Sequence, residues 1–350
     1  MAPAVAVENS VLEDHIALAA AEARVLRASN NAIDAIGIVG STALGRCDIG
    51  SDIDLVAIVA EPPGKAVTSR NIGAVRIDVE WLRWDEAVAT ASQGGWAWEL
   101  RKSARLGAAV PLYDPSNRFA DLARCAAAAR PDLQRYATEL QAVRQRLAEV
   151  AEAGETDSAS NEPLRGVLDS LALLFLLTTP NRYQKAKWTI EDLIAADESL
   201  FASALIGAYG FAEADQGDAT RRIRAAEDCL NAVFDRLEQP AVAALVAMGY
   251  APEHVEASYC ARTLADARDL ARVERYAEAA YVAGFAARLA IGMLRDCASG
   301  GLEAMAATAG FGALYAACFG ERRPRPGSVA IAGRTIDRCA DWLIQQGDRA

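Results

Sequence analysis

The sequence predicts an α+β protein with a mixed β-sheet domain over residues 1–120, followed by an all-helical domain over residues 121–350. Two observations indicate this division. Short apolar or alternating runs typical of strands occur in the first third of the chain, whereas from Phe119 onward nearly every segment has helical spacing. With 350 residues, 52% of them hydrophobic, the chain is long and apolar enough for two cores.

The elements of the first domain follow from local patterns. Val11 to Ser29 is Ala-rich with apolar residues at helical spacing, so we expect a helix that packs on the sheet. Ile36 to Val39 is a short apolar run typical of a buried strand. Asp52 to Val59 and Ala74 to Trp81 begin with strict alternation, which predicts two more strands. Ala109 to Pro115 has the pattern of a last strand that ends in a turn.

Breakers and helical runs complete the chain. Pro62-Pro63-Gly64 interrupts the chain between the second and third strands, and Asp85 to Ala91 and Trp96 to Leu106 are predicted as short helices. In the second domain we expect helices at Asp121–Ala129, Asp132–Ala153, Pro163–Leu177, Lys185–Ala196, Ala219–Leu237, Pro240–Met248, Pro252–Leu294 with breaks, and Thr335–Gln346.

A Gly-Ser pair follows the first predicted strand. Gly40 has no Cβ, so backbone N–H groups at this corner can come close to an anion, and Ser41 adds a hydroxyl. If a helical turn begins at Ser41, its free N–H groups and positive dipole end face the same anion. The pair therefore predicts a turn that binds phosphate.

Three aspartates are predicted to meet beside this turn. Asp52 and Asp54 lie two residues apart and so point to one face of their strand, and Asp78 joins them if the next predicted strand pairs alongside. Carboxylates this close disfavour each other's charge unless a hard cation lies between them. Three carboxylates can hold two Mg²⁺ ions roughly 3.5–4 Å apart, which suits phosphoryl displacement on a nucleoside triphosphate.

The order of Gly40-Ser41, Asp52-x-Asp54 and a later strand aspartate resembles the signature of the nucleotidyltransferase superfamily, which has the DNA polymerase beta-like fold. The resemblance is to its bacterial branch of antibiotic-modifying enzymes, such as kanamycin nucleotidyltransferase. Ser51, directly before the aspartate pair, is also usual in that branch and would belong to the nucleotide site. Thr42 to Arg46 departs from the aromatic and Arg-Gly residues that often follow Gly-Ser there, which leaves triphosphate contacts beyond Ser41 undefined.

The resemblance implies a Mg²⁺-dependent nucleotidyltransferase. Asp52, Asp54 and Asp78 would bind the metals, and Gly40 and Ser41 would hold the terminal phosphates. The reaction would move a nucleoside monophosphate, AMP from ATP in the simplest case, onto a hydroxyl or similar group of a small molecule and release pyrophosphate. The alternatives are adenylylation of a protein side chain and a nucleotide-binding sensor that has lost turnover.

Further site residues are open to two interpretations. Glu80 shares the polar side of its strand with Asp78, so Asp78, Glu80 or a carboxylate of the helical half would be the general base; otherwise Glu80 is simply solvated. Related enzymes often place a lysine and an aromatic residue on a helix that lines the nucleotide cleft, and Lys187 with Tyr183 would fill these roles. The alternative is an amphipathic helix with Trp188 in the core and its lysines in solvent.

Composition excludes several other classes. The net charge of −11 opposes nucleic-acid partners and suits a cationic or neutral small acceptor. Seven scattered cysteines without CxxC spacing and only two histidines exclude a zinc cluster and favour reduced, buried thiols. The sequence has no P-loop, no GxGxxG fingerprint, no HExxH and no GxSxG motif. No stretch predicts a signal peptide or a membrane span, so we expect a cytoplasmic protein; a homodimer is left open.

Overall fold

The computed structural model describes residues 3–48, 50–92, 95, 97–153, 161–179, 185–211, 213–234, 245, 257–297, 318–319 and 327–347. The chain forms two compact units. The first, the sheet unit, comprises Met1–Asp132, and the second, the helical unit, comprises Leu133–Thr179 and Gln184–Ala350. A mixed sheet in the first unit and helices in the second confirm the predicted α+β class.

The sheet unit contains a five-stranded sheet in the order β3-β4-β2-β1-β5. Its strands are β1 (Ile33–Val39), β2 (Ile53–Val59), β3 (Val67–Ile72), β4 (Val75–Leu82) and β5 (Val110–Tyr113). β2 and β4 are parallel neighbours, and the other pairs are antiparallel. This pairing is the one that the predicted aspartate site requires.

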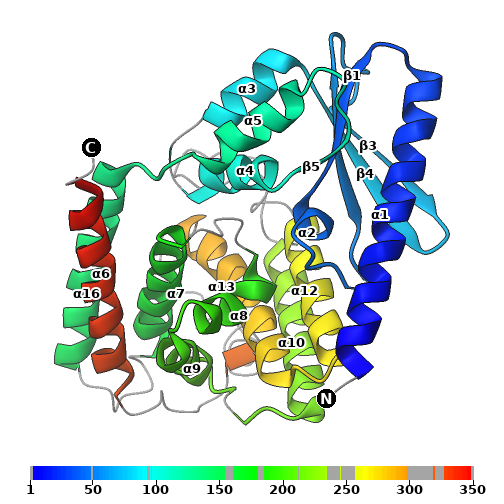
Figure 1. Ribbon diagram of the computed structural model, residues 1–350. Helices are drawn as coiled ribbons and strands as arrows, with labels where there is room; N and C mark the ends of the chain where they lie inside the picture. The colour runs from blue at the N-terminus through cyan, green and yellow to red at the C-terminus, as the bar shows by residue number, and fades with distance from the viewer. Residues whose placement is uncertain are drawn as a thin grey trace. The chain divides into compact units, whose positions relative to one another are not determined.

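Helices cover both faces of this sheet (Figure 1). The long α1 (Pro3–Ser29) lies on one face. The other face carries α3 (Trp84–Ser92), α4 (Ala97–Gly107) and α5 (Arg118–Ala127). Odd-numbered residues of β2 and β4 are apolar and pack toward α1, as the alternation in the sequence predicts. Even-numbered residues therefore face the side of α3, α4 and α5.

The edge strand β3 is a strand that the sequence patterns did not predict. Its residues are mostly polar and exposed, because an edge strand outside the core needs no apolar alternation. β3 pairs only with β4, through a turn at Gly73. It is also anchored to α1, since Arg70 forms an ion pair with the buried Glu22. Burial raises the pKa of Glu22, and the charge of Arg70 opposes that shift.

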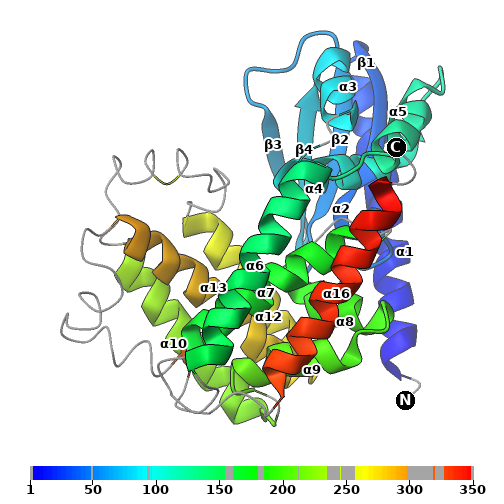
Figure 2. The same cartoon turned by 90° about the vertical axis from the view of Figure 1, so that its left-hand side faces the viewer.

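The helical unit follows most of the predicted segments. Its helices are α6 (Leu133–Ala153), α7 (Asn161–Leu177), the 3₁₀ turn η2 (Ala186–Trp188), α8 (Thr189–Ala195), α9 (Ser199–Ala208), α10 (Gln216–Phe234), α12 (Ala257–Arg272), α13 (Tyr276–Cys297) and α16 (Ser328–Gly347). Figure 2 shows α6 and α16, from opposite ends of this unit's sequence, lying side by side.

Two differences from the predicted helices have local causes. α9 was not predicted, because its residues are nearly all apolar or small and it lacks the polar face that marks an amphipathic helix. The run expected at Pro252–Leu294 is divided between α12 and α13 where Glu274 adopts a positive φ of 63°. Of the helix expected at Pro240–Met248, only Leu245 lies within the described residues.

The burial of the cysteines and the hydropathy of the helices can be compared with the sequence predictions. Cys47, Cys229, Cys260, Cys318 and Cys339 form no disulfide and are buried, as expected, whereas Cys125 is exposed. The expectation of a buried thiol is wrong for Cys125 because it lies outside the buried stripe of α5, which Phe119, Leu122, Ala123 and Ala126 form. Within the described segments, no helix combines the length and apolar character needed to cross a bilayer.

Candidate functional site

Strand register brings the three predicted aspartates together. In the parallel pair β2/β4, Asp54 is the register partner of Asp78, and Asp52 lies just before β2 begins. One carboxylate oxygen from each of Asp52, Asp54 and Asp78 lies within 4.8 Å of the other two, and all three residues are half-buried. We call these residues the acidic cluster. The prediction that Asp78 joins the aspartate pair is confirmed.

The glycine corner lies directly against this cluster. β1 ends at Val39, whose register partner on β2 is Asp54, so the next residue, Gly40, must pass beside the Asp54 side chain. Gly40 has a φ of +72°, and a Cβ placed on it would come closer than 3.0 Å to Oδ2 of Asp54. Only glycine satisfies both conditions. The predicted approach of the Gly40 backbone to a phosphate stays a prediction, whereas the contact that the structure shows at this corner is with the Asp54 carboxylate.

The hydroxyl beside this glycine is enclosed. Ser41 belongs to the short helical turn α2 (Gly40–Ala43), and only 1% of its surface is exposed. Its Oγ has no hydrogen-bond partner among the described residues, and the same holds for Oγ1 of Thr42. A buried hydroxyl without a hydrogen-bond partner lowers the stability of the fold by about 1–3 kcal/mol. Such a group is typical of a position that binds a ligand or an ordered water. The expected contact between Ser41 and phosphate stays a prediction, and it requires neighbouring groups to move.

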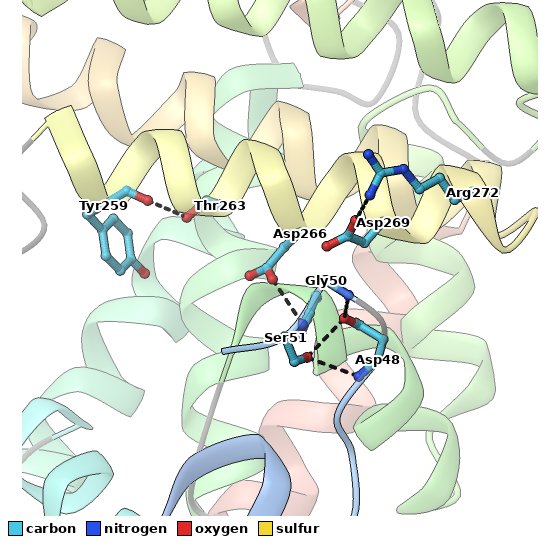
Figure 3. A network of polar contacts seen from close by, with 9 residues as sticks. Asp48, Gly50, Ser51, Tyr259, Thr263, Asp266, Asp269 and Arg272 are labelled. Atoms are coloured by element: carbon cyan, nitrogen blue, oxygen red, sulfur yellow. Dashed lines mark hydrogen bonds and ion pairs between the residues drawn. The ribbon is translucent and has the colours of Figure 1, made fainter. Parts of the chain in front are cut away.

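The loop before β2 forms a closed turn (Figure 3). The Asp48 backbone N–H donates to Ser51 Oγ at 3.0 Å, and Ser51 Oγ donates to Asp48 Oδ1 at 2.9 Å. The Gly50 N–H donates to the same Oδ1 at 3.1 Å. The turn fixes the chain just ahead of Asp52. Ser51 thus has a local positioning role, and its predicted contact with a nucleotide remains untested.

Two arginines reach the acidic cluster, and neither was predicted as a site residue. Arg76 lies on the same side of β4 as Asp78, and its Nε donates to Asp78 Oδ1 at 2.8 Å. The pKa of Arg76 is raised, chiefly by this hydrogen bond and further by the negative charges of the cluster. Arg105 comes from α4, and its Nη2 lies 3.3 Å from Asp54 Oδ1.

Glu80 has a partner that neither sequence interpretation included. Its carboxylate forms an ion pair with Arg105, so it is not simply solvated. α4 brings Arg105 to this face because the adjacent Leu106 is buried in the core between the helices and the sheet. Arg105 therefore links Glu80 to Asp54. Alternation along β4 could have indicated Arg76, whereas no local signal indicates Arg105.

The composition of the cluster fits a hard divalent cation. Its donors are carboxylate oxygens only, the ligands that Mg²⁺ and Ca²⁺ prefer, with no thiolate or imidazole to favour zinc. Among the described residues, this is the one group of three or more potential metal ligands at such short separations. The residues therefore suit the metal expected from the sequence.

Neither the family models nor the curated proteins searched match this chain. A functional assignment therefore depends on the residues themselves.

Of the second predicted pair of site residues, the structure describes Lys187, which belongs to the helical unit. Lys187, in η2, is buried, and its Nζ lies 3.0 Å from Oδ1 of Asp266 on α12. Trp188 is in the core, as one interpretation predicted, but that interpretation is wrong in placing Lys187 in solvent. α12 carries another ion pair, in which Arg272 Nη1 donates to Asp269 Oδ1 at 2.5 Å (Figure 3). A nucleotide contact for Lys187 stays a prediction, and Tyr183 lies outside the described residues.

Proposed function

We propose that this protein is a Mg²⁺-dependent nucleotidyltransferase that moves AMP from ATP onto a hydroxyl of a small molecule. The observation that carries the proposal is the acidic cluster beside Gly40, in the order and spacing of the nucleotidyltransferase signature. A cluster of three carboxylates this close is electrostatically costly unless it has cations to bind. The sheet unit would then be the catalytic domain, and the helical unit would bind the acceptor.

The reaction forms one bond and breaks another. The acceptor oxygen attacks the α-phosphorus of ATP, the bond from that phosphorus to the bridging oxygen breaks, and pyrophosphate leaves with the bonding electrons. Divalent cations at the cluster would supply positive charge to the attacking and leaving oxygens. Asp52 and Asp54 would hold them, with Asp78 as the third ligand. The enzyme's work is to position and to neutralise charge.

The proton of the acceptor needs a carboxylate, and the two candidates on β4 differ. Both carboxylates are paired with an arginine, Glu80 with Arg105 and Asp78 with Arg76, so ion pairing does not separate them, whereas their places relative to the acidic cluster do. Asp78 lies in the cluster itself, so we assign the proton to Asp78. The net charge of −11 favours an acceptor that is cationic or neutral.

Labelled ATP tests the proposal. The purified full chain is incubated with Mg²⁺, α-³²P-ATP and hydroxyl-rich amines such as kanamycin, and with the low-molecular-weight fraction of a cell extract. We expect pyrophosphate release and label on a small molecule. Asp52→Asn and Asp78→Asn should each lower turnover by about a thousandfold or more, as expected when a metal ligand is lost. Asp121→Asn, on the exposed side of α5, is the matched control and should leave turnover unchanged.

The same experiment separates the alternatives. Label on protein instead of on a small molecule would favour the adenylylation of a side chain. Nucleotide binding without transfer to any acceptor would favour the sensor. Turnover that survives Asp52→Asn and Asp78→Asn at the wild-type rate would refute catalysis at the acidic cluster.

A further inference from the structure

The two arginines at the acidic cluster are held in different ways. Arg105 is shared between Glu80 and Asp54, and its side chain is only 23% exposed. Arg76 contacts one carboxylate, Asp78, and its side chain is 53% exposed. Its other hydrogen bond goes to a neutral group, Ser69 Oγ, at 3.2 Å. Arg105 is therefore fixed by charges on two strands, whereas Arg76 is a half-exposed cation held by one.

Arg76 engages one of the two carboxylate oxygens of Asp78, a proposed metal ligand. Its Nε donates to Oδ1 of Asp78, one of the two oxygens that this ligand can offer to a cation. A carboxylate oxygen that accepts from a guanidinium has less electron density left for a second cation. The guanidinium and a divalent ion would also repel each other across a few ångströms. Arg76 must therefore weaken the binding of a metal that arrives alone.

When the metal arrives with a polyphosphate, the electrostatic effect of Arg76 on metal binding changes. The phosphate oxygens bring negative charge that can take over the guanidinium, and Arg is suited to bind phosphate through two parallel hydrogen bonds. Because the Arg76 side chain is 53% exposed, a rotation that exchanges Asp78 for such a ligand would not require the core to open. Loss of its contact with Asp78 would release Oδ1 to the metal.

We propose that Arg76 is an internal counter-ion of the acidic cluster that gives up Asp78 when metal and nucleotide phosphates bind together. This inference rests on the proposed function, since it takes the nucleotide as the ligand. Its consequence is coupling: each of the two ligands, metal and nucleotide, increases the affinity for the other, and Arg76 contributes to that increase.

Metal and nucleotide affinities measured separately test this coupling. Mn²⁺ binding to the full chain is followed by the electron paramagnetic resonance signal of free Mn²⁺. Binding of α,β-methylene-ATP is followed by calorimetry without metal and at saturating Mn²⁺, and the ratio of the two affinities gives the coupling. Arg76→Gln should bind Mn²⁺ alone about fivefold more tightly, because a repelling charge is gone. It should bind the nucleotide about tenfold more weakly, because a charged phosphate donor is gone.

Two further variants make the result specific. Arg76→Lys keeps the charge but not the planar fork, so it should keep the Mn²⁺ affinity of the wild type and still lose nucleotide affinity. Arg124→Gln removes an arginine paired with Asp121 on α5 and should change neither affinity. An unchanged or weakened Mn²⁺ affinity in Arg76→Gln, or an unchanged nucleotide affinity, would overturn the inference.

Asp78→Asn distinguishes a failure of this inference from a failure of the proposed function. If Asp78→Asn abolishes Mn²⁺ binding while Arg76→Gln behaves as the wild type, the metal site stands and only the role of Arg76 is refuted. If Asp78→Asn binds Mn²⁺ as tightly as the wild type, the cluster is not the metal site, and both proposals fall.

Discussion

Replacing Gly40 with alanine tests whether the corner after β1 positions Asp54. Gly40 has a positive φ of +72°, and a Cβ there would come closer than 3.0 Å to Asp54 Oδ2. The substitution thus has two separate costs, one in the backbone and one in the carboxylate that must move away. The second cost falls on a proposed metal ligand, so stability and metal binding should change together.

The two costs can be separated by a matched control. Gly73, in the turn between β3 and β4, has a φ of +60° and no atom within 4 Å of a placed Cβ. Gly73→Ala should therefore lower the free energy of unfolding only by the cost of a left-handed backbone at a residue with a Cβ, about 1–2 kcal/mol. Gly40→Ala adds an overpacking cost of about 1–3 kcal/mol. Its free energy of unfolding should fall by about 2–5 kcal/mol in total.

Urea unfolding and Mn²⁺ titration measure the two effects. Gly40→Ala should show the larger loss of unfolding free energy and at least a tenfold loss of Mn²⁺ affinity, because Asp54 is displaced from the acidic cluster. Gly73→Ala should keep the wild-type affinity for Mn²⁺. Equal unfolding free energies for the two variants, with Mn²⁺ affinity intact in both, would refute the argument that Gly40 is required by its contact with Asp54.

Three further predictions concern charged and buried groups. Glu80→Gln should lower turnover by less than about tenfold with an unchanged pH profile, because Glu80 holds Arg105; a hundredfold loss would identify it as the base. Burial lowers the pKa of His15 from 6.5, so the unfolded chain binds more protons than the folded one. The free energy of unfolding should therefore decrease as the pH is lowered below about 6.5. His15→Gln should remove that part of the pH dependence, and an identical profile would contradict it. Tyr209 donates to Asp169 at 2.5 Å, and Tyr209→Phe should lower the unfolding free energy in urea by about 1–3 kcal/mol; no change would contradict a buried hydrogen bond there.

Alkaline stability follows from the same tyrosine. Burial raises the pKa of Tyr209 well above its usual 10.0. The folded chain therefore keeps a proton that the unfolded chain loses, so this contribution is complete below about pH 10 and decreases above it.

Much of the sheet unit could be predicted from local sequence. Alternation with a period of two residues fixes which side of a strand each residue occupies, so the shared face of Asp54, Asp78 and Glu80 follows from the order of residues. The need for glycine at position 40 comes instead from its positive φ and from the nearness of the Asp54 carboxylate, which the sequence did not show. β3 was missed because an exposed edge strand does not need the apolar alternation that marks a buried one.

The contacts of the site residues depended on tertiary structure. Glu80 and Arg105 are far apart in sequence and meet only because Leu106 packs α4 on the sheet. Lys187 meets Asp266 because η2 and α12 pack together. Ser41 reads as an accessible hydroxyl in the sequence, but packing encloses it.

The sequence by itself determined which carboxylate donors share a face of the sheet, because residue order and strand period set this. Only the tertiary structure decided how those donors are charged and held. An ion pair such as Arg76 with Asp78 or Arg105 with Glu80 depends on distances of a few ångströms between side chains, and these distances are set by packing. Local patterns carry no information about that packing.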